Sequence, residues 1–290
     1  MQIYEALDWA KSLGIGVFDR QVIMLHCLGQ PTHNKAFLIS HDQDILTQPQ
    51  IADYKALIHR CQRGEPVAYL TGYKEFYGLE FKVTPATLIP RPDTETLVQW
   101  AIETIDAKKH EALNILDLGT GSGCIAISLK HARPTAQVWA TDLSPQALEV
   151  AQVNAGAHTQ ADTPNIHFRL GSWFEALEPG ENQLKFDLIV SNPPYIAEHD
   201  PHLAALQFEP YSALVAGDSG LSAYTQILRS ALKYLRPEGW ILFEHGYNQG
   251  QEIHRLFEQF GFESIQSRND LAGICRCTGG RGPKNGIIGP

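Results

Sequence analysis

The chain has 290 residues, a hydrophobic content of 43% and a formal net charge of -9. This length is enough for about two domains, and the apolar content suffices for ordinary buried cores. The negative charge disfavours a surface that wraps a phosphate backbone, because that affinity comes from Lys and Arg displacing counterions; it suits a basic protein partner better. No apolar run approaches the ~20 residues that span a bilayer, so no membrane partner is expected.

The five cysteines are odd in number and scattered, and the N-terminus lacks a basic start followed by an apolar run. Both features predict a reduced, cytoplasmic protein. Cys275 and Cys277 form only a C-x-C, without the second pair that a tetrahedral zinc site needs, and the histidines lack metal-like pairing. The sequence therefore predicts no metal site, and core packing for the two cysteines.

Residues 1–65 have apolar positions at helical spacing, such as Ile3, Leu7 and Ala10. Thr47 and Pro49 stand where an N-cap and a first-turn proline belong. The pattern predicts a small helical bundle that forms an N-terminal domain. Two interpretations stay open: the bundle serves packing alone, or it binds a macromolecular substrate.

Residues 66–92 change to aromatic and β-branched positions broken by glycine and proline, as from Tyr69 to Tyr73 and around Phe81. This composition is typical of short strands and tight turns. We expect a β-hairpin linker here.

From residue 93 to residue 279, apolar strands alternate with amphipathic helices. Such alternation predicts a mainly parallel, doubly wound α/β sheet of the Rossmann-like kind. Expected strands are 113–117, 137–142, 166–170, 186–191 and 239–244, and expected helices are about 124–131, 145–155, 221–235 and 249–260. Residues 280–290 are rich in glycine and proline and have little to bury, so a flexible tail is expected.

A glycine-rich turn follows the first of these strands and opens a helix; it comprises Gly119, Thr120, Gly121, Ser122 and Gly123. Glycine lets the backbone turn sharply and approach a ligand closely. The next strand ends in Asp142, where a carboxylate can accept hydrogen bonds from a ribose diol. The turn therefore predicts a nucleotide-type cofactor.

Two cofactors fit such a turn. NAD prefers G-x-G-x-x-G, with a helix N-terminus facing a pyrophosphate. This chain has G-x-G-x-G preceded by Asp117, the pattern of S-adenosylmethionine enzymes, and acidic residues suit a ligand with sulfonium and ammonium groups. Asp117 either braces the loop or contacts the cofactor. Trp173, after the third strand, is placed to stack on adenine.

A fourth strand delivers Asn192, Pro193, Pro194 and Tyr195 to the sheet edge where ligands bind in this fold. The Asn192 side-chain oxygen and the Pro193 carbonyl can each accept one N–H of a planar NH2 group. The prolines stiffen the loop, and Tyr195 can cover the planar group. We therefore expect these four residues to bind substrate and to perform catalysis on an amide or amino nitrogen.

With these motifs the chain resembles the release factor glutamine methyltransferase family, the enzymes that modify peptide chain release factors. The resemblance spans residues 1–279. Its motifs here are Gly64–Gly72, Leu88–Glu95, Asp117–Gly123, Asn192–Tyr195 and Phe243–Gly246. The Pro90-Arg91-Pro92 segment with Thr94 and Glu95 is the most discriminating of them.

The resemblance implies transfer of a methyl group from S-adenosyl-L-methionine to the glutamine of the Gly-Gly-Gln loop in release factors. It also implies that the helical domain binds the release factor. It assigns cofactor contacts to Gly119–Gly123, Asp142, Trp173 and Asn192, and glutamine contacts to Asn192–Tyr195. Arg91, Pro92 and Glu95 are expected to line the same pocket. The tail after Gly280 has no counterpart in the family's pattern.

Two other functions remain open. A DNA or RNA adenine N6-methyltransferase acts on a similar planar NH2 group, but it would need a basic groove and base flipping. The acidic charge and the absence of a Lys/Arg-rich segment weigh against direct nucleic-acid binding. A non-catalytic binding module is disfavoured by the intact Asn192 and glycine turn.

Overall fold

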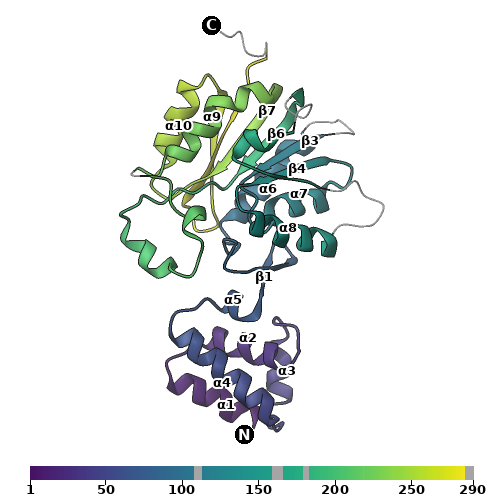
Figure 1. The fold of residues 1–290 in the computed structure, drawn as a ribbon, viewed down its shortest axis with the longest axis vertical. Helices are drawn as coiled ribbons and strands as arrows, with labels where there is room; N and C mark the ends of the chain where they lie inside the picture. Colours follow the sequence, from purple (N-terminus) through teal and green to yellow (C-terminus); the bar gives the residue numbers. More distant parts are fainter. Residues whose placement is uncertain (108–112, 159–165, 179–182, 218, 285–290) are drawn as a thin grey trace. The chain divides into compact units, whose positions relative to one another are not determined.

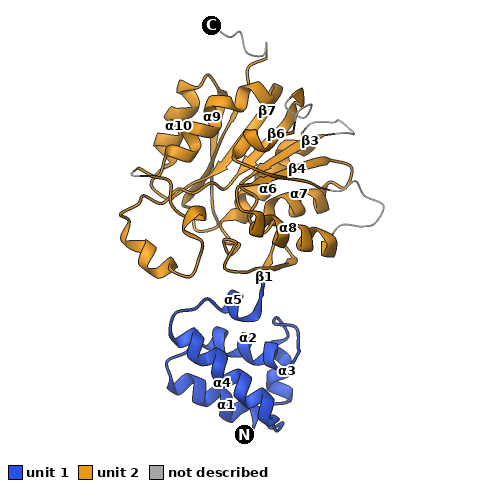
Figure 2. Ribbon diagram, in the orientation of Figure 1, with its two compact units in different colours: residues 1–73 blue, residues 74–290 orange. Residues whose placement is uncertain are grey.

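The computed structural model describes residues 1–107, 113–158, 166–178, 183–217 and 219–284. The chain divides into two compact units, Met1–Tyr73 and Lys74–Pro290 (Figure 2). No helix in these ranges is both long enough and apolar enough to cross a bilayer.

The first unit is a helical bundle made of α1 (Ile3–Ser12), α2 (Val17–Cys27), α3 (Lys35–Ser40), α4 (Gln48–Gln62) and α5 (Val67–Thr71) (Figure 1). Its core contains Ile3, Met24, Tyr54 and Ile58. The predicted cap of α4 is confirmed, because the Thr47 hydroxyl accepts a hydrogen bond from the backbone N–H of Gln50. The unit thus has an apolar core of its own.

The predicted hairpin is present, but it is shorter than the predicted linker. Strands β1 (Tyr73–Phe76) and β2 (Leu79–Lys82) form a two-stranded sheet. Residues 67–71 are helical instead, bracketed by Pro66 before the helix and by Gly72, which has a φ of +80°. Proline before a helix and a left-handed glycine after it are typical boundaries, and Leu70 packs into the bundle core.

The second unit contains a seven-stranded sheet, which confirms the doubly wound fold. Its strands are β3 (Asn114–Leu118), β4 (Gln137–Asp142), β5 (His167–Leu170), β6 (Phe186–Ser191), β7 (Leu235–Glu244), β8 (Glu263–Asn269) and β9 (Cys275–Arg281). The spatial order is β5-β4-β3-β6-β7-β9-β8. The chain order reverses between β3 and β6, so these two parallel neighbours form the topological switch point.

Helices cover both faces of this sheet (Figure 1). One core is built with α6 (Thr94–Asp106), α7 (Cys124–Ala132) and α8 (Pro145–His158), and the other with α9 (Ser222–Tyr234), α10 (Gly250–Gln259) and the 3-10 helix η1 (Trp173–Ala176). Strand residues alternate between the cores: Ile115 and Val190 lie in the first, Leu116 and Ile189 in the second.

The last two strands, β8 and β9, are antiparallel to their neighbours and were not predicted. The prediction of a tail from residue 280 is wrong at its start, because β9 includes Gly280 and Arg281. Gly280 is buried, and a Cβ there would lie 2.6 Å from Cδ1 of Phe257. The glycines therefore serve close packing inside a strand. Residues 285–290 of the predicted tail lie outside the described ranges.

Candidate functional site

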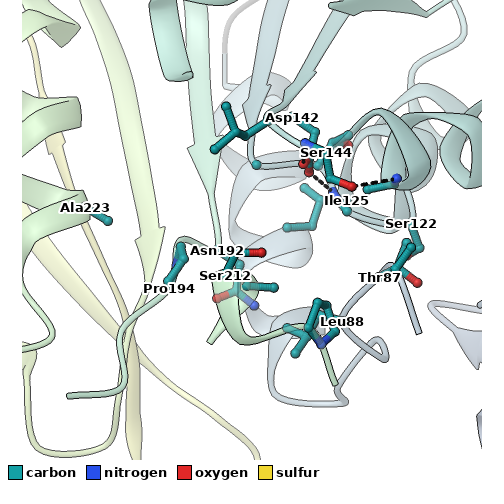
Figure 3. A pocket seen from close by; sticks show the side chains of 18 of the residues that line it. Thr87, Leu88, Ser122, Ile125, Asp142, Ser144, Asn192, Pro194, Ser212 and Ala223 are labelled. Carbon is teal, nitrogen blue, oxygen red and sulfur yellow. Dashed lines mark hydrogen bonds between the residues drawn. The ribbon is translucent and has the colours of Figure 1, made fainter. Parts of the chain in front are cut away.

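A cavity of about 550 Å³ opens at the carboxyl ends of β3 and β6, beside the switch point (Figure 3). This volume lies in the usual range of small-molecule sites, roughly 300–1,000 Å³. Eight of the residues predicted to contact cofactor or substrate line it, as does Arg91: Gly119, Thr120, Gly121, Ser122, Asp142, Trp173, Asn192 and Pro194. The cavity therefore brings the glycine turn and the asparagine-proline loop together.

The glycine turn wraps one end of the cavity. Gly119 and Gly121 have φ values of +73° and +56°, in the left-handed region that favours glycine. The backbone N–H groups of Gly119 and Thr120 both donate to the Thr141 carbonyl at 2.9 Å, which ties the turn to β4. A Cβ on Gly121 would meet nothing within 4 Å, so this position faces open space.

Gly123 is not among the residues that line the cavity, and its predicted cofactor contact stays a prediction. Its φ is +83°, and a Cβ there would lie 2.8 Å from Cδ1 of Ile127 and 3.1 Å from Cβ of Ala151. The glycine at this position allows α7 and α8 to pack closely. Its role is in packing next to the site.

Asp117 braces the turn. Its Oδ2 accepts hydrogen bonds from the Thr120 hydroxyl at 2.7 Å and from the Ala126 N–H at 3.2 Å. The carboxylate is fully buried, and burial raises the pKa of Asp117 to about 7. These contacts favour the bracing interpretation of this residue.

Asp142, at the end of β4, accepts hydrogen bonds from the backbone N–H groups of Gly121 at 2.8 Å and Ser144 at 2.9 Å. Burial nevertheless raises the pKa of Asp142 above its ordinary value. A carboxylate has about four acceptor positions, so it retains capacity for donors on a ligand. Asp142 is thus fixed in place and available to the cavity (Figure 3).

Trp173 begins η1 with an unusual φ of +47°. Its indole N–H donates to Oε1 of Gln226 at 3.1 Å, and its ring lies beside the Cα face of Gly119. The strained backbone places an aromatic ring on the cavity wall. Stacking of this ring on adenine stays a prediction.

Only two of the four residues from Asn192 to Tyr195 line the cavity, Asn192 and Pro194. Pro193 is buried. Tyr195 packs against the core of the α9 and α10 face, and its carbonyl accepts a hydrogen bond from Nε2 of Gln249 at 3.0 Å. The side chain of Tyr195 therefore packs beside this core, and its predicted contact with substrate stays a prediction.

The Asn192 amide has a polar partner on α6: its Nδ2 donates to Oγ1 of Thr94 at 3.3 Å. Next to this pair lies the Glu244 carboxyl, which is 2% exposed. Burial raises the pKa of Glu244 to about 7, while side-chain hydrogen bonds with Thr94 and Asn192 act in the opposite direction.

An ion pair between Arg91 and Glu209 joins two edges of the cavity. Glu209 also accepts a hydrogen bond from the Ile89 N–H at 3.1 Å, so its carboxylate links the segment before α6 to the segment that follows β6. Arg91 lines the cavity as expected, whereas Pro92 and Glu95 do not. Glu95 instead accepts a hydrogen bond from the Tyr77 N–H at 3.1 Å.

Sequence reasoning missed several lining residues, including Leu143, Ser144, Gln146, Ser212, Ala213, Ser222 and Gln226. One of them had a readable signal: Ser144 before Pro145 is a helix-cap pattern, and its hydroxyl accepts from the Ala147 N–H at 3.1 Å. Gln146 lies in the first turn of α8, and the others come from the segments after β4 and β6 and from α9, whose approach to the glycine turn depends on tertiary packing.

Two family profiles match the chain. A profile described as a methyltransferase domain matches residues 109–278, and one described as the PrmC N-terminal domain matches residues 5–72. The first covers more than half of the chain.

Curated relatives match over nearly the whole length. A protein of Burkholderia pseudomallei named release factor glutamine methyltransferase is 42% identical over 283 residues, which is 96% of each chain. A protein of Vibrio cholerae with the same name is 43% identical over 265 residues, or 91% of this chain and 88% of that one. Among solved structures, a methyltransferase from Pyrococcus furiosus has a TM-score of 0.51 at 16% identity, and the match covers 80% of this chain and 99% of that one. This structure supports the fold alone.

Proposed function

Because the chain belongs to the release factor glutamine methyltransferase family, we propose that it methylates the side-chain amide nitrogen of the glutamine in the Gly-Gly-Gln motif of peptide chain release factors. The methyl donor is S-adenosyl-L-methionine. The observation that carries the proposal is that Asn192 and the glycine turn line one cavity.

The residues of the cavity fit this cofactor. Gly121 leaves open space beside the turn, and Ser122 has a buried hydroxyl without a hydrogen-bond partner among the described residues. Asp142 keeps acceptor capacity for ribose hydroxyls, and Trp173 offers an aromatic face for adenine. When bound, S-adenosylmethionine supplies an electrophilic methyl group on a sulfonium.

An amide nitrogen is a weak nucleophile, because its lone pair is committed to the resonance that gives amides a rotation barrier of about 18–20 kcal/mol. The protein must therefore orient and polarise the amide. The Asn192 side-chain oxygen and the Pro193 carbonyl would each accept one N–H of the glutamine NH2. Such alignment before attack is worth up to ~7–11 kcal/mol of the barrier.

Two acceptors also select the substrate. A carboxylate has no N–H to donate and would be repelled by two acceptor oxygens, so glutamate is excluded. Pro193 and Pro194 restrict the backbone, which holds the acceptors in place before the substrate arrives. We assign this selection to the loop from Asn192 to Tyr195.

The helical unit, Met1–Tyr73, is the part of the chain that we assign to release-factor binding. It matches the PrmC N-terminal domain profile, whereas the cavity belongs entirely to the other unit. A formal charge of -9 suits a basic protein partner, since complementary charge raises the association rate.

The decisive experiment incubates the purified protein with methyl-labelled S-adenosylmethionine and an intact release factor. A release factor with glutamate in place of the Gly-Gly-Gln glutamine serves as the matched control, with duplex DNA and bulk RNA in parallel. We expect label on the wild-type release factor alone. Label on nucleic acid and none on the release factor would replace this proposal with an adenine N6-methyltransferase.

A further inference from the structure

Glu244, the last residue of β7, is a buried acid that the proposed chemistry does not use. Its side chain is 2% exposed, it does not line the cavity, and its Oε2 has no hydrogen-bond partner among the residues that the structure describes. Burial of a carboxyl without full hydrogen bonding destabilises a fold, because the desolvation of the unpaired oxygen is not compensated.

Strand pairing brings Glu244 next to Asn192. In the parallel register of β6 and β7, Ser191 is the partner of Phe243, so the following residues, Asn192 and Glu244, leave adjacent strands at the same level. Thr94, the first residue of α6, joins them: its Oγ1 accepts from Nδ2 of Asn192 at 3.3 Å. Both side chains also act on the adjacent Glu244 carboxyl, where hydrogen bonding from each of them opposes the rise of its pKa.

The direction of these hydrogen bonds follows from the chemistry of the three groups. An ionised carboxylate only accepts, so the Thr94 hydroxyl must donate its single proton to Glu244. The hydroxyl oxygen can then only accept from Asn192, which requires the NH2 end of the amide. The two ends of an asparagine amide are nearly the same size, so hydrogen-bonding neighbours decide which end points where.

We propose that Glu244, acting through Thr94, is a positioning residue that turns the Asn192 amide so that its Oδ1 is left for the substrate. With Nδ2 committed to Thr94, the acceptor end of the amide is the end available to the cavity that Asn192 lines. The reversed amide would present donors to a substrate NH2 and would repel it. This inference rests on the proposed function for the identity of the substrate.

A purely structural role for Glu244 would be to hold the start of α6 against β7. The two roles differ in what they predict, because a structural residue affects folding and cofactor binding together with catalysis. An orienting residue affects the catalytic step and the orientation of the Asn192 amide, and its loss leaves the shape of the cavity unchanged.

The test compares Glu244→Gln, Thr94→Val and Thr94→Ser with the wild-type enzyme. Glutamine keeps the shape of Glu244 but can present an NH2 group to Thr94, and valine removes the hydroxyl at constant volume, whereas serine retains it. We expect kcat to fall by on the order of 100-fold in T94V and at least 10-fold in E244Q. In T94S kcat should stay within a few-fold of the wild type, and the Kd for S-adenosylmethionine should change less than about three-fold in all variants. Equal losses in T94S and T94V, or a parallel loss of cofactor affinity, would overturn the proposal.

A second measurement does not depend on the substrate. The side-chain NH2 resonances of Asn192 in 15N NMR spectra, assigned by their loss in Asn192→Asp, should shift in T94V and E244Q and remain in place in T94S. Unchanged resonances in E244Q and T94V would refute the orienting role. If the wild-type enzyme failed to methylate release factors while these shifts appeared, the proposed substrate would be wrong and the orientation of Asn192 would stand.

Discussion

Glu244 is a buried acid whose contribution to the stability of the protein depends on pH. Its carboxyl is fully buried beside the Thr94–Asn192 pair, and burial raises its pKa to about 7 from an ordinary 4.5. The folded protein therefore keeps this proton between about pH 4.5 and pH 7, where the unfolded chain has released it. The contribution of Glu244 to stability thus falls as pH rises through this window, and the penalty is complete above about pH 7.

Replacement of Glu244 by glutamine should remove this pH dependence. The free energy of unfolding of E244Q minus that of the wild type should increase by up to about 3 kcal/mol when the pH is raised from 5 to 8. The variant therefore becomes the more stable protein relative to the wild type as the pH rises. Urea denaturation at both pH values measures this difference, and Asp117, which titrates in the same range, is common to both proteins and cancels. A difference that does not vary with pH would mean that Glu244 does not change its protonation in this range.

The kcat of the wild-type enzyme should rise with pH through about 7, because the ionised Glu244 holds Asn192 in the active orientation. The pH profile of T94V, which lacks the connecting hydroxyl, should be flatter, and an identical profile would argue against this link. The ionisable groups that interact electrostatically with Glu244 come from the elements packed around it: Asp93, Cys124, Tyr195, Tyr224, Arg276 and Cys277.

At the scale of elements, β9 shows how glycine can belong to a strand interior. A Cβ on Gly279 would overlap Cδ2 of Leu242, and it would lie 2.9 Å from the Ile241 carbonyl oxygen and 3.0 Å from the Trp100 ring. The strand pairs antiparallel with β7, so these contacts lie between neighbouring strands and under α6. Gly282, just after the strand, has no neighbour closer than 3.6 Å to such a Cβ.

We therefore expect Gly279→Ala to destabilise the protein by roughly 1–3 kcal/mol, through overpacking. Gly282→Ala is the matched control, because it adds the same methyl group where there is room, and it should stay within about 0.5 kcal/mol of the wild type. Urea denaturation provides both values. Similar stability of the two variants would show that β9 does not pack as tightly as described.

At the scale of the whole molecule, catalysis and recognition are assigned to different units. The cavity is formed within Lys74–Pro290, and Met1–Tyr73 has a separate apolar core. This division allows the helical unit to be removed without touching the cavity lining. The division also allows the role of the helical unit in substrate binding to be tested separately from its role in packing.

A chain of residues 74–290 should bind S-adenosylmethionine with a Kd within a few-fold of that of the full chain, since every lining residue is retained. Its kcat/KM for an intact release factor should fall by at least about 10-fold, because each 1.4 kcal/mol of lost binding is a factor of ten. Calorimetry and methyl-transfer kinetics measure the two quantities. Full activity of the shortened chain would show that the helical unit does not bind the substrate.

The sequence by itself determined the alternation of strands and helices, the cofactor turn and the loop at Asn192, because hydrophobic periodicity and glycine spacing are local signals. It could not determine what depends on contacts between distant segments. Gly123 and Tyr195 belong to recognised motifs, yet Gly123 packs closely against Ala151 and neither residue lines the cavity. The neighbouring positions of Thr94, Asn192 and Glu244 arise only when α6, β6 and β7 assemble, since 98 residues separate the first two in the chain. Local patterns specify which elements form, and the register of the sheet decides which side chains meet.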